Sequence, residues 1–326
     1  MTNIFKFIFL ISLLYNSSLF ANNPEFNSWL EIFKERAKQN GISDETINKT
    51  LHNAKFLPKV IQYDRYQPEF YEDTFTYIGK RVTKSKVKKG TNLFKKEKKT
   101  ISKIEEQFLV EKELLLALMG IETNFGKYLG KMDIISSLAT LSFDKRRSEF
   151  FSFQLLTLLK LIDKKLIDPK DLYGSWAGAY GNFQFMPTTI SNYAIDYDKN
   201  NKIELKKSLM DSLASAANYI SRIGWRRGEP CFYRVELTKK LKKKYINTSA
   251  RNIKNKLKVS KWKQKGVVGY NGQELKGNLK AALILPDGKI GSPAFLVFMN
   301  YEKILKWNRS LRFGISVCTL AQKIKV

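Results

Sequence analysis

Histidine and cysteine are nearly absent from this chain of 326 residues, which contains one histidine and two cysteines. A zinc site built from cysteines and histidines cannot be assembled from so few ligands. A Ser-His-Asp or Cys-His catalytic site would have to use His52, which lies in a segment rich in lysine and asparagine without nucleophile-elbow spacing. If the chain is an enzyme, we expect carboxylates to carry its protons.

Acidic residues are also scarce, because 30 of them face 58 lysines and arginines and leave a formal net charge of +28. This charge alone suggests nucleic acid, an anionic membrane surface or an anionic polymer as the partner. The excess is concentrated in residues 80–99 and 238–273, whereas residues 101–230 carry a net charge of only +2. We interpret the two basic blocks as solvated flanks that can hold the protein on an anionic wall or membrane, with a lysine-rich composition bias as the alternative.

Residues 1–21 have the features of a secretory signal peptide. Lys6 precedes an apolar run over residues 7–15, and small residues before position 22 offer a cleavage site. The run is shorter than the roughly 20 apolar residues of a transmembrane helix, although an uncleaved anchor is the alternative. The absence of a cysteine near the cleavage point argues against a lipid anchor. Export disfavours nucleic acid as a partner, and it allows Cys231 and Cys318 to form a disulfide or to remain two buried thiols.

Helical periodicity dominates residues 25–230, and short β-like runs follow Pro230. We expect helices over residues 27–38, 101–125, 148–167, 188–195 and 209–223, the last with Gly224 as its C-cap. We expect strands over residues 231–237, 267–270 and 281–285, with turns at Asn271-Gly272 and Asp287-Gly288 and a return to helix from residue 295 to residue 326.

The predicted fold class is therefore α+β, predominantly α, with no internal repeat. We divide the chain into a signal peptide, an N-terminal helical region, a central core, a small β-containing subdomain and C-terminal helices that return to the core. The proposed boundaries are 1–21, 22–100, 101–230, 231–292 and 293–326.

One glutamate lies in an apolar helical stripe of the central core. Leu115, Leu118 and Glu122 share one face at helical spacing. Phe125 continues this face, and we expect Gly126 to end the helix just beyond it. A carboxylate on an inward stripe loses hydration, so its pKa rises and it can act as a general acid near neutral pH. Glu122 is thus a candidate catalytic acid, and an ordinary glutamate at a helix end, or one paired with a buried arginine, is the alternative.

Glycines and aromatic residues alternate over residues 173–187. Glycines let a ligand approach the backbone closely, and aromatic rings suit the apolar faces of sugar rings. Ser175, Asn182 and Gln184 offer neutral hydrogen bonds to hydroxyl or N-acetyl groups. A tightly packed loop with core aromatics is the alternative.

Together these segments closely resemble the membrane-bound lytic murein transglycosylase B family of the lysozyme-like superfamily. The resemblance runs from about Trp29 to Ile324, nearly the whole mature chain. Its motifs occur in order at residues 64–70 (DRYQPEF), 120–126 (GIETNFG), 137–144 (SLATLSFD), 146–151 (RRSEFF), 174–179 (GSWAGA), 184–187 (QFMP), 214–219 (ASAANY) and 307–310 (WNRS).

The resemblance implies a lysozyme-like catalytic core that cleaves the β-1,4 bond between N-acetylmuramic acid and N-acetylglucosamine in peptidoglycan glycan strands. Glu122 would be the single acid/base, which protonates the glycosidic oxygen and then deprotonates the muramoyl C6 hydroxyl to close a 1,6-anhydro ring. Most glycosidases need two carboxylates, but here an internal nucleophile replaces water. The resemblance also implies periplasmic localisation and cell-wall synthesis or hydrolysis complexes as partners, without nucleic acid.

The resemblance places further side chains at the cleft. Ser175 and Gln184 would lie near the reacting sugar, and Arg146 and Arg147 would meet peptide-stem or lactyl carboxylates. Trp307 and Asn308 stand where the family usually has Tyr-Asn. Tyr77 would be an aromatic sugar contact. Asn308 would bond the N-acetyl group. For Arg146 and Arg147, an ion pair with Asp144 or Glu149 is the alternative.

Some members of this family carry an EF-hand-like Ca²⁺ loop, although no cofactor is required. The equivalent segment keeps oxygen ligands at alternate positions, with one acid farther on: Asp196, Asp198, Asn200 and Asp211. Asn201 replaces the glycine of the sharp turn, and Lys207 stands where a glutamate is expected. Structural Ca²⁺ is therefore a hypothesis.

Three other functions remain open. A muramidase would use water at the same site, and a non-catalytic scaffold would bind peptidoglycan without cleaving it. An exported basic protein that binds nucleic acid or anionic lipid would rest on charge alone and would show steep salt dependence.

Overall fold

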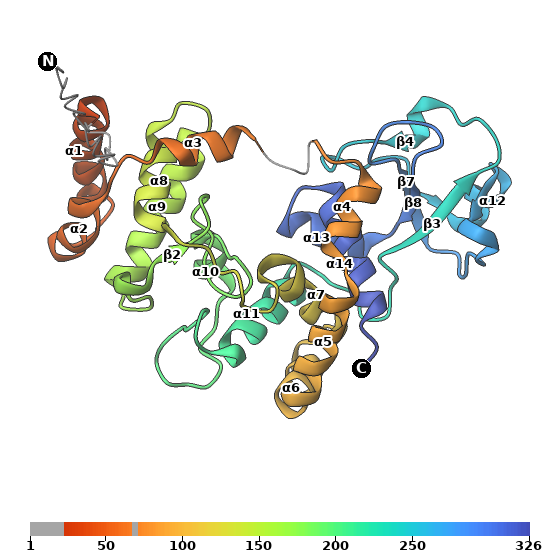
Figure 1. Cartoon of the computed structure of the whole chain (residues 1–326), viewed down its shortest axis with the longest axis horizontal. Helices are drawn as coiled ribbons and strands as arrows, with labels where there is room; N and C mark the ends of the chain where they lie inside the picture. The colour runs from red at the N-terminus through yellow and green to blue at the C-terminus, as the bar shows by residue number, and fades with distance from the viewer. Residues whose placement is uncertain (1–22, 67–70) are drawn as a thin grey trace, which may run out of the picture.

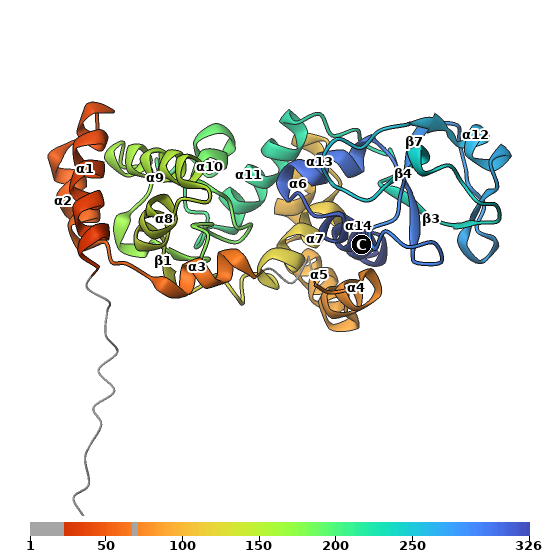
Figure 2. The same cartoon turned by 90° about the horizontal axis from the view of Figure 1, so that it is seen from above.

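The computed structural model describes residues 23–66 and 71–326, so the proposed signal peptide and part of the 64–70 motif lie outside the described residues. The molecule is elongated, with a group of helices at one end and a small twisted sheet at the other (Figures 1 and 2). Helices account for 54% of the residues and strands for 9%, which confirms a predominantly α fold of the α+β class.

The N-terminal helices are α1 (Pro24–Gln39), α2 (Asp44–Thr50) and α3 (Pro58–Arg65). Helix α1 begins three residues earlier than expected, because Pro24 occupies its first turn and the Asn23 side chain accepts a hydrogen bond from Phe26 N at 2.9 Å. Helix α3 packs against α8 (Ile134–Phe143), which belongs to the helical end of the molecule (Figure 1).

Four helices follow: α4 (Thr74–Arg81), α5 (Lys84–Lys96), α6 (Lys98–Phe108) and α7 (Lys112–Thr123). The single helix expected over 101–125 is wrong, because Leu109 adopts a left-handed φ of 54° and separates α6 from α7. Both flanking segments have helical periodicity, so the hydrophobic pattern alone does not reveal the break. The basic block at residues 80–99 is therefore mostly helix α5, with α4 and α6 at its ends.

The central core contains α8 (Ile134–Phe143), α9 (Ser148–Asp163), α10 (Pro187–Tyr193) and α11 (Leu209–Arg222). A two-stranded ribbon, β1 (Met132–Asp133) and β2 (Tyr173–Gly174), closes one side of it. Helix α9 ends four residues before its expected end, and Lys165 takes a left-handed φ of 59° just after it. The helices expected at 188–195 and 209–223 are confirmed to within two residues.

The small sheet is built from β3 (Phe232–Leu237), β4 (Ile246–Asn247), β6 (Val267–Gly269), β7 (Lys280–Ile284) and β8 (Ala294–Val297), in the order β4-β7-β8-β3-β6. Strand β5 (Leu257–Lys258) pairs with β7 and leads into α12 (Val259–Gln264). The sheet has its own apolar core around Trp262, whose indole N–H donates to Ala281 O at 2.8 Å. Short 3₁₀ turns complete the chain at Leu51–Asn53, Pro169–Asp171, Lys243–Tyr245 and Tyr270–Gly272.

The expected return to helix at residue 295 is wrong, because β8 lies there and pairs with both β3 and β7. All four residues of β8 are buried, and a short apolar run reads equally well as helix or strand. The β-containing unit thus extends to Val297, five residues beyond the proposed boundary at 292.

Helices α13 (Met299–Trp307) and α14 (Leu311–Lys323) return to the core, and α14 packs against α7. A disulfide joins Cys231, just before β3, to Cys318 in α14, so the two thiols left open by the sequence are paired. The disulfide and α14 therefore connect the sheet to the helix that carries Glu122.

Candidate active site

Glu122 lies in the last turn of α7, and its side chain is partly buried. The same helix face buries Leu115 and Leu118 completely, as the apolar stripe predicts. Helix α7 ends at Thr123, three residues before Gly126, because Asn124 and Phe125 both adopt left-handed conformations. Phe125 therefore does not continue the helical face, and the expected end at Gly126 is wrong.

The Phe125 ring turns back between α5 and α7, where two glycines make room for it. A Cβ on Gly120 would lie 2.8 Å from Phe125 Cζ, and one on Gly90 would lie 3.2 Å from the same atom. Only a residue without a side chain allows this contact at Gly120. The ring therefore fixes the end of α7 against the basic helix α5.

A hydrogen bond connects Glu122 to the other end of the chain. The indole Nε1–H of Trp307, the last residue of α13, donates to Glu122 Oε1 at 2.9 Å. This bond fixes the orientation of the carboxyl group. The resemblance places Trp307 at the sugar, and no pattern in the sequence indicates a contact with Glu122, which is 185 residues away.

Aromatic residues surround Trp307 and hold its ring. Tyr219 of α11 stacks on it with ring centroids 5.1 Å apart, and Phe185 lies at 5.2 Å. Tyr193 stacks on the far side of Tyr219. Burial raises the pKa of Tyr219 to about 12, so its hydroxyl stays protonated and donates to Lys306 O at 3.1 Å. The 214–219 motif contained Tyr219, but the sequence suggested no role for it.

The end of α7 is also tied to the glycine-rich loop. Thr123 Oγ1 donates to Asn182 O at 2.8 Å, and Asn182 Nδ2 donates to Ser212 Oγ of α11 at 3.0 Å. Asn182 is buried, so its amide stabilises the loop and is not exposed to a ligand. The loop is thus held against the same helix that carries Glu122.

Ser175 forms hydrogen bonds within its own segment, and Gln184 bonds both this segment and the residues after α7. Ser175 Oγ accepts from Ala179 N at 3.0 Å, and Gln184 Nε2 donates to Gly181 O at 3.0 Å and to Leu129 O at 3.2 Å. Both side chains are partly buried. Their hydrogen bonds shape the loop, and a role toward a sugar stays a prediction for both residues.

Arg146 and Arg147 pair with Asp64, and neither side chain pairs with Asp144 or Glu149. Arg146 Nε donates to Asp64 Oδ2 at 2.7 Å, and Arg147 Nη2 donates to Asp64 Oδ1. The Asp64 side chain is 1% exposed, whereas both arginines stay about two-fifths exposed. The alternative ion pairs of these arginines with Asp144 or Glu149 are therefore wrong. Asp144 pairs with Arg65 and Glu149 with Arg36.

Tyr77 of α4 is only 3% exposed, and the guanidinium carbon of Arg81 lies 3.4 Å from its ring centroid. Arg81 also pairs with Glu72 at 2.8 Å. One face of the Tyr77 ring is thus covered by a cation, and the proposed sugar contact does not fit this arrangement. The expectation fails because the helical pattern did not show that Tyr77 faces the core.

The basic block on α5 approaches the candidate acid. Lys89 Nζ donates to Asn124 Oδ1 at 3.2 Å. Burial lowers the pKa of Lys86, the charges of Arg81 and Lys89 lower it further, and the charge of Glu122 opposes them. Lys86 therefore lies within electrostatic reach of Glu122. Arg81, Lys86 and Lys89 are thus partly buried, whereas the other basic residues of the block are exposed, as a solvated flank requires.

A groove of about 850 Å³ begins beside Trp307 and Asn308. The N-terminal parts of α9 and α10, the α13–α14 connection and residues 248–251 of the sheet unit line it. Arg147 is among the lining residues, whereas Arg146, Ser175, Gln184 and Glu122 itself are not, and Glu122 reaches the groove through its bond to Trp307. The structure thus brings Glu122, Trp307, Asn308 and Arg147 to one region.

The candidate metal loop brings three acids together. Carboxylate oxygens of Asp196, Asp198 and Asp211 lie within 4.8 Å of one another. Asn201 takes a φ of 68°, so an asparagine supplies the tight turn that a glycine usually provides. Asn200 Oδ1 accepts from Lys202 N at 2.9 Å and supports the loop. Three close carboxylates suit a hard divalent cation, so the residues present fit Ca²⁺.

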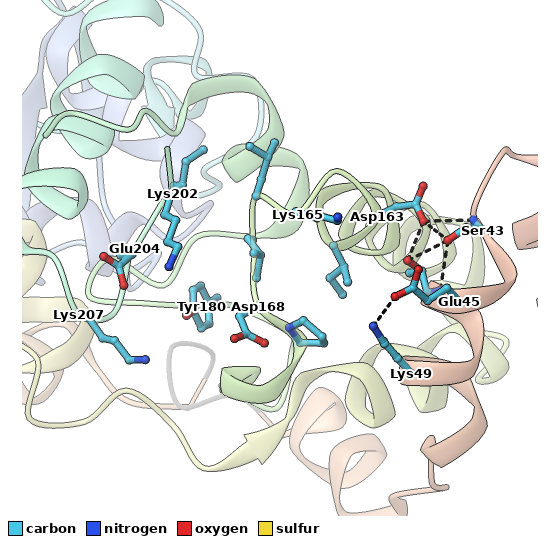
Figure 3. Close-up of a pocket in the computed structure, with 16 residues that line it drawn as sticks. Ser43, Glu45, Lys49, Asp163, Lys165, Asp168, Tyr180, Lys202, Glu204 and Lys207 are labelled. Carbon is cyan, nitrogen blue, oxygen red and sulfur yellow. Dashed lines mark hydrogen bonds and ion pairs between the residues drawn. The ribbon is translucent and has the colours of Figure 1, made fainter. Parts of the chain in front are cut away.

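A separate pocket of about 440 Å³ lies between α2, the end of α9 and residues 202–207. Figure 3 shows Lys202, Glu204 and Lys207 on one side of it, and Ser43 and Asp163 on the other. Asp163 accepts hydrogen bonds from Ser43 and from Thr46 Oγ1, the latter at 2.7 Å. None of the predicted site residues lines this pocket.

No helix in residues 23–66 and 71–326 is long and apolar enough to cross a membrane.

Comparison with known proteins agrees with the geometry. The family model described as Transglycosylase SLT domain matches residues 25–322. The chain is 27% identical over 317 residues to the membrane-bound lytic murein transglycosylase B of Escherichia coli (strain K12), which covers 94% of this chain and 84% of that protein.

Solved structures show the same fold. SltB3 from Pseudomonas aeruginosa, in complex with NAG-anhNAM-pentapeptide, has a TM-score of 0.83 at 32% identity and covers 92% of this chain and 79% of that chain. The Escherichia coli lytic transglycosylase Slt35, in complex with calcium, has a TM-score of 0.76 at 27% identity, with 94% of both chains covered. The chain therefore belongs to the transglycosylase SLT domain family of lytic transglycosylases, which are lyases acting on peptidoglycan.

Proposed function

We propose that Glu122 is the single acid/base of this lytic transglycosylase and that its products carry 1,6-anhydro-N-acetylmuramic acid ends. The observation that carries the proposal is the setting of Glu122. Its carboxyl group is bonded to Trp307, which lines a groove that no aspartate or glutamate of the described residues lines, Glu122 included. Glycosidases that rely on two carboxylates place them about 5–9.5 Å apart across the scissile bond. One carboxylate beside such a groove suits the mechanism in which the substrate supplies its own nucleophile.

In this mechanism Glu122 performs two proton transfers in sequence. It first donates a proton to the glycosidic oxygen, so that the bond to the departing N-acetylglucosamine breaks. The resulting carboxylate then accepts the proton of the muramoyl C6 hydroxyl as that oxygen attacks C1. Glu122 ends protonated, as it began. The Trp307 N–H bond keeps the carboxyl group in one orientation through both steps, and closure of the ring requires that water does not take the place of the hydroxyl.

The remaining site residues would orient the sugar. Asn308 lines the groove next to Trp307 and would bond the muramoyl N-acetyl group. Arg147 lines the same groove and offers donors to an anionic substituent. Ser175 and Gln184 would act near the reacting ring through the loop that their hydrogen bonds shape. Arg146 would act mainly by holding Asp64 and, through it, Arg147.

Analysis of muropeptide products tests the mechanism. Purified peptidoglycan digested by the wild-type protein should yield anhydro-muropeptides by mass spectrometry. Products with reducing ends would instead identify a muramidase, in which water attacks C1. Binding without products would identify a non-catalytic scaffold. Normal cleavage by a Glu122→Gln variant would show that another group is the acid.

The relatives also guide the proposals for cofactor and location. Slt35 binds calcium, and the cluster of Asp196, Asp198 and Asp211 would hold Ca²⁺ here as a structural ion, with no role in the proton transfers. We propose that residues 1–21 direct export and that the enzyme acts in the periplasm, where the disulfide between Cys231 and Cys318 is stable. Assembly with other cell-wall enzymes stays a prediction.

A further inference from the structure

We propose that a basic arm of the groove, lined by Arg251, Lys306 and Arg309, binds the carboxylates of the peptide stem attached to the sugar strand. The proposal rests on the proposed function, because it assumes that a glycan strand lies beside Glu122. It adds a recognition site for a specific part of the substrate, formed by residues of the sheet unit and of the α13–α14 connection.

The arm is a continuation of the groove that begins at Trp307 and Asn308. A second hollow of about 660 Å³ joins the first and shares Ala250, Arg251, Lys306 and Arg309 with it. It runs between α13 and residues 250–256 of the sheet unit. The hollow therefore leads away from the candidate acid as a branch. A substituent of the strand would follow such a branch, whereas the strand itself would stay beside Glu122.

The charges along the arm are almost all positive. Of the residues that the structure describes, five cations and no acids line the first hollow: Arg147, Arg251, Lys306, Arg309 and Arg312. Arg147 pairs with Asp64 and Arg312 with Asp287. The second hollow has one acid, Glu302, which pairs with Lys256 at 2.6 Å.

Three cations of the arm have no acidic partner among the described residues. Within residues 23–66 and 71–326, no carboxylate forms an ion pair with the side chain of Arg251, Lys306 or Arg309. Unpaired like charges gathered in one concave surface repel one another, and an anionic ligand removes that repulsion. The charges of the arm therefore favour binding of a ligand with more than one negative charge.

The segment that presents Arg251 is held in place. Asn247, in β4, uses its side chain to close the segment: Oδ1 accepts from Lys254 N at 2.8 Å, and Nδ2 donates to Lys254 O at 3.0 Å. The same Nδ2 donates to Leu283 O of β7 at 3.0 Å. Arg251 thus projects from a loop fastened to the sheet, which lowers the entropy lost when it binds a ligand.

Peptidoglycan chemistry identifies the ligand class. Once the lactyl group is joined to a peptide, the sugar strand itself is neutral and every carboxylate lies on the peptide. A neutral strand gains nothing from unpaired guanidinium groups, whereas carboxylates form charge-assisted and often bidentate bonds with them. The arm also offers Leu305, Ile253 and Ala250 for small apolar side chains. A short peptide with several carboxylates fits both features.

The test compares two forms of one substrate. Glycan strands that carry peptide stems are compared with strands from the same preparation that an amidase has stripped of peptides, which leaves one lactyl carboxylate on each muramoyl residue. Both forms are digested by the wild type and by an Arg251→Ala/Arg309→Ala variant. We expect the ratio of kcat/KM for stem-bearing to stem-free strands to fall about 10-fold in the variant, because two charge-assisted contacts are lost. The ratio for the wild type should fall toward that of the variant as salt is raised.

Two control variants separate the arm from general charge effects. Lys261→Ala/Lys263→Ala removes the same charge from α12 of the same sheet unit, outside both hollows, and should leave the ratio unchanged. Arg251→Lys/Arg309→Lys keeps the charge but removes the planar guanidinium groups, which can donate two parallel hydrogen bonds to a carboxylate. This variant should recover only part of the wild-type ratio of kcat/KM values. The melting temperature of each variant checks that it folds.

The outcomes distinguish the arm from the proposed function. An unchanged ratio in Arg251→Ala/Arg309→Ala, or an equal fall in the Lys261→Ala/Lys263→Ala control, would overturn the arm as a peptide site. A variant that loses binding to anionic phospholipid vesicles while its ratio stays unchanged would overturn it in favour of a membrane. Failure of the proposed function would look different, because the wild type would then release no anhydro products from either form of the strand.

Discussion

The helical part of the molecule and the sheet unit meet at the groove, and they differ in how they use charge. Glu122 accepts a hydrogen bond from the neutral indole of Trp307, Tyr219 stacks on that indole, and the ionic side chains of Arg146, Arg147 and Asp64 are mutually paired. The sheet unit has its own apolar core, and residues 238–273 carry twelve basic residues and no acids. In the proposed mechanism the helical part thus provides the chemistry, whereas the sheet unit provides a charged surface next to it.

This difference changes the meaning of the net charge of +28. The basic residues do not form one uniform coat, because Lys86 of α5 lies within electrostatic reach of Glu122 and Arg251 and Lys256 line an arm of the groove. The lysines of α12 lie outside that groove. Charge at two particular places can act on the substrate, and the rest increases solubility and attraction to anionic surfaces.

The largest expected effect concerns the helical part. Glu122→Gln keeps the hydrogen bond from Trp307 but removes the proton that the reaction transfers. We expect turnover to fall at least about 1,000-fold, as for the loss of a general acid/base, with an unchanged melting temperature. Release of anhydro-muropeptides measures the effect. A Glu111→Gln variant is the control, because Glu111 also accepts an indole N–H bond, from Trp225. A fall of less than about 10-fold in Glu122→Gln would contradict the assignment.

The second effect tests how the two parts depend on each other. The disulfide closes 87 residues of chain and ties the start of β3 to α14. A Cys231→Ser/Cys318→Ser variant should lose about 3 kcal/mol of unfolding free energy, because its unfolded chain is less restricted. Since the sheet unit has its own core, we expect two unfolding transitions in urea where the wild type has one. A single transition with an unchanged midpoint would show that the disulfide is not needed to couple them.

The fold class and most helices could be predicted from local patterns, and the errors have local causes. A periodic pattern continues across Leu109, although one left-handed residue there separates α6 from α7. The apolar run at 294–297 is compatible with a helix and with a strand, and only its pairing with β3 and β7 makes it a strand. Both errors concern information that lies in backbone geometry or in distant partners, which hydrophobic periodicity does not contain.

The candidate site was predictable at Glu122 and much less so around it. An acid in an apolar stripe is a local signal. The Trp307 bond, the aromatic stack of Tyr219 and the pairing of two arginines with Asp64 join residues that are 82 to 185 positions apart or lie on different helices. The contribution of α5 could be expected only in part, because alternating lysines on a helix usually face solvent.

The third effect separates orientation of the acid from its chemistry. Trp307→Phe keeps the ring that packs on Tyr219 but removes the N–H bond to Glu122. We expect kcat to fall about 10- to 30-fold, because the carboxyl group is held less well, while KM changes little. The matched variant Trp225→Phe removes the indole bond to Glu111 and should leave kcat unchanged. Equal effects of the two variants on kcat would show that Trp307 acts only through stability.

The smallest effect concerns Ca²⁺ in the loop of the helical part. Burial raises the pKa of Asp198, and the charges of Asp211 and Asp196 add to this rise. A bound cation would turn this repulsion into attraction, so excess Ca²⁺ should raise the melting temperature by about 3 °C over that in chelator. Asp198→Asn should abolish the rise and, in chelator, melt at or slightly above the wild type, because one repulsive charge is gone. The signs of these two shifts in melting temperature distinguish a cation site from an acidic turn. As a control, Asp287→Asn alters an acid outside the cluster and should leave the response to Ca²⁺ intact. A wild-type melting curve that Ca²⁺ does not change would exclude the site.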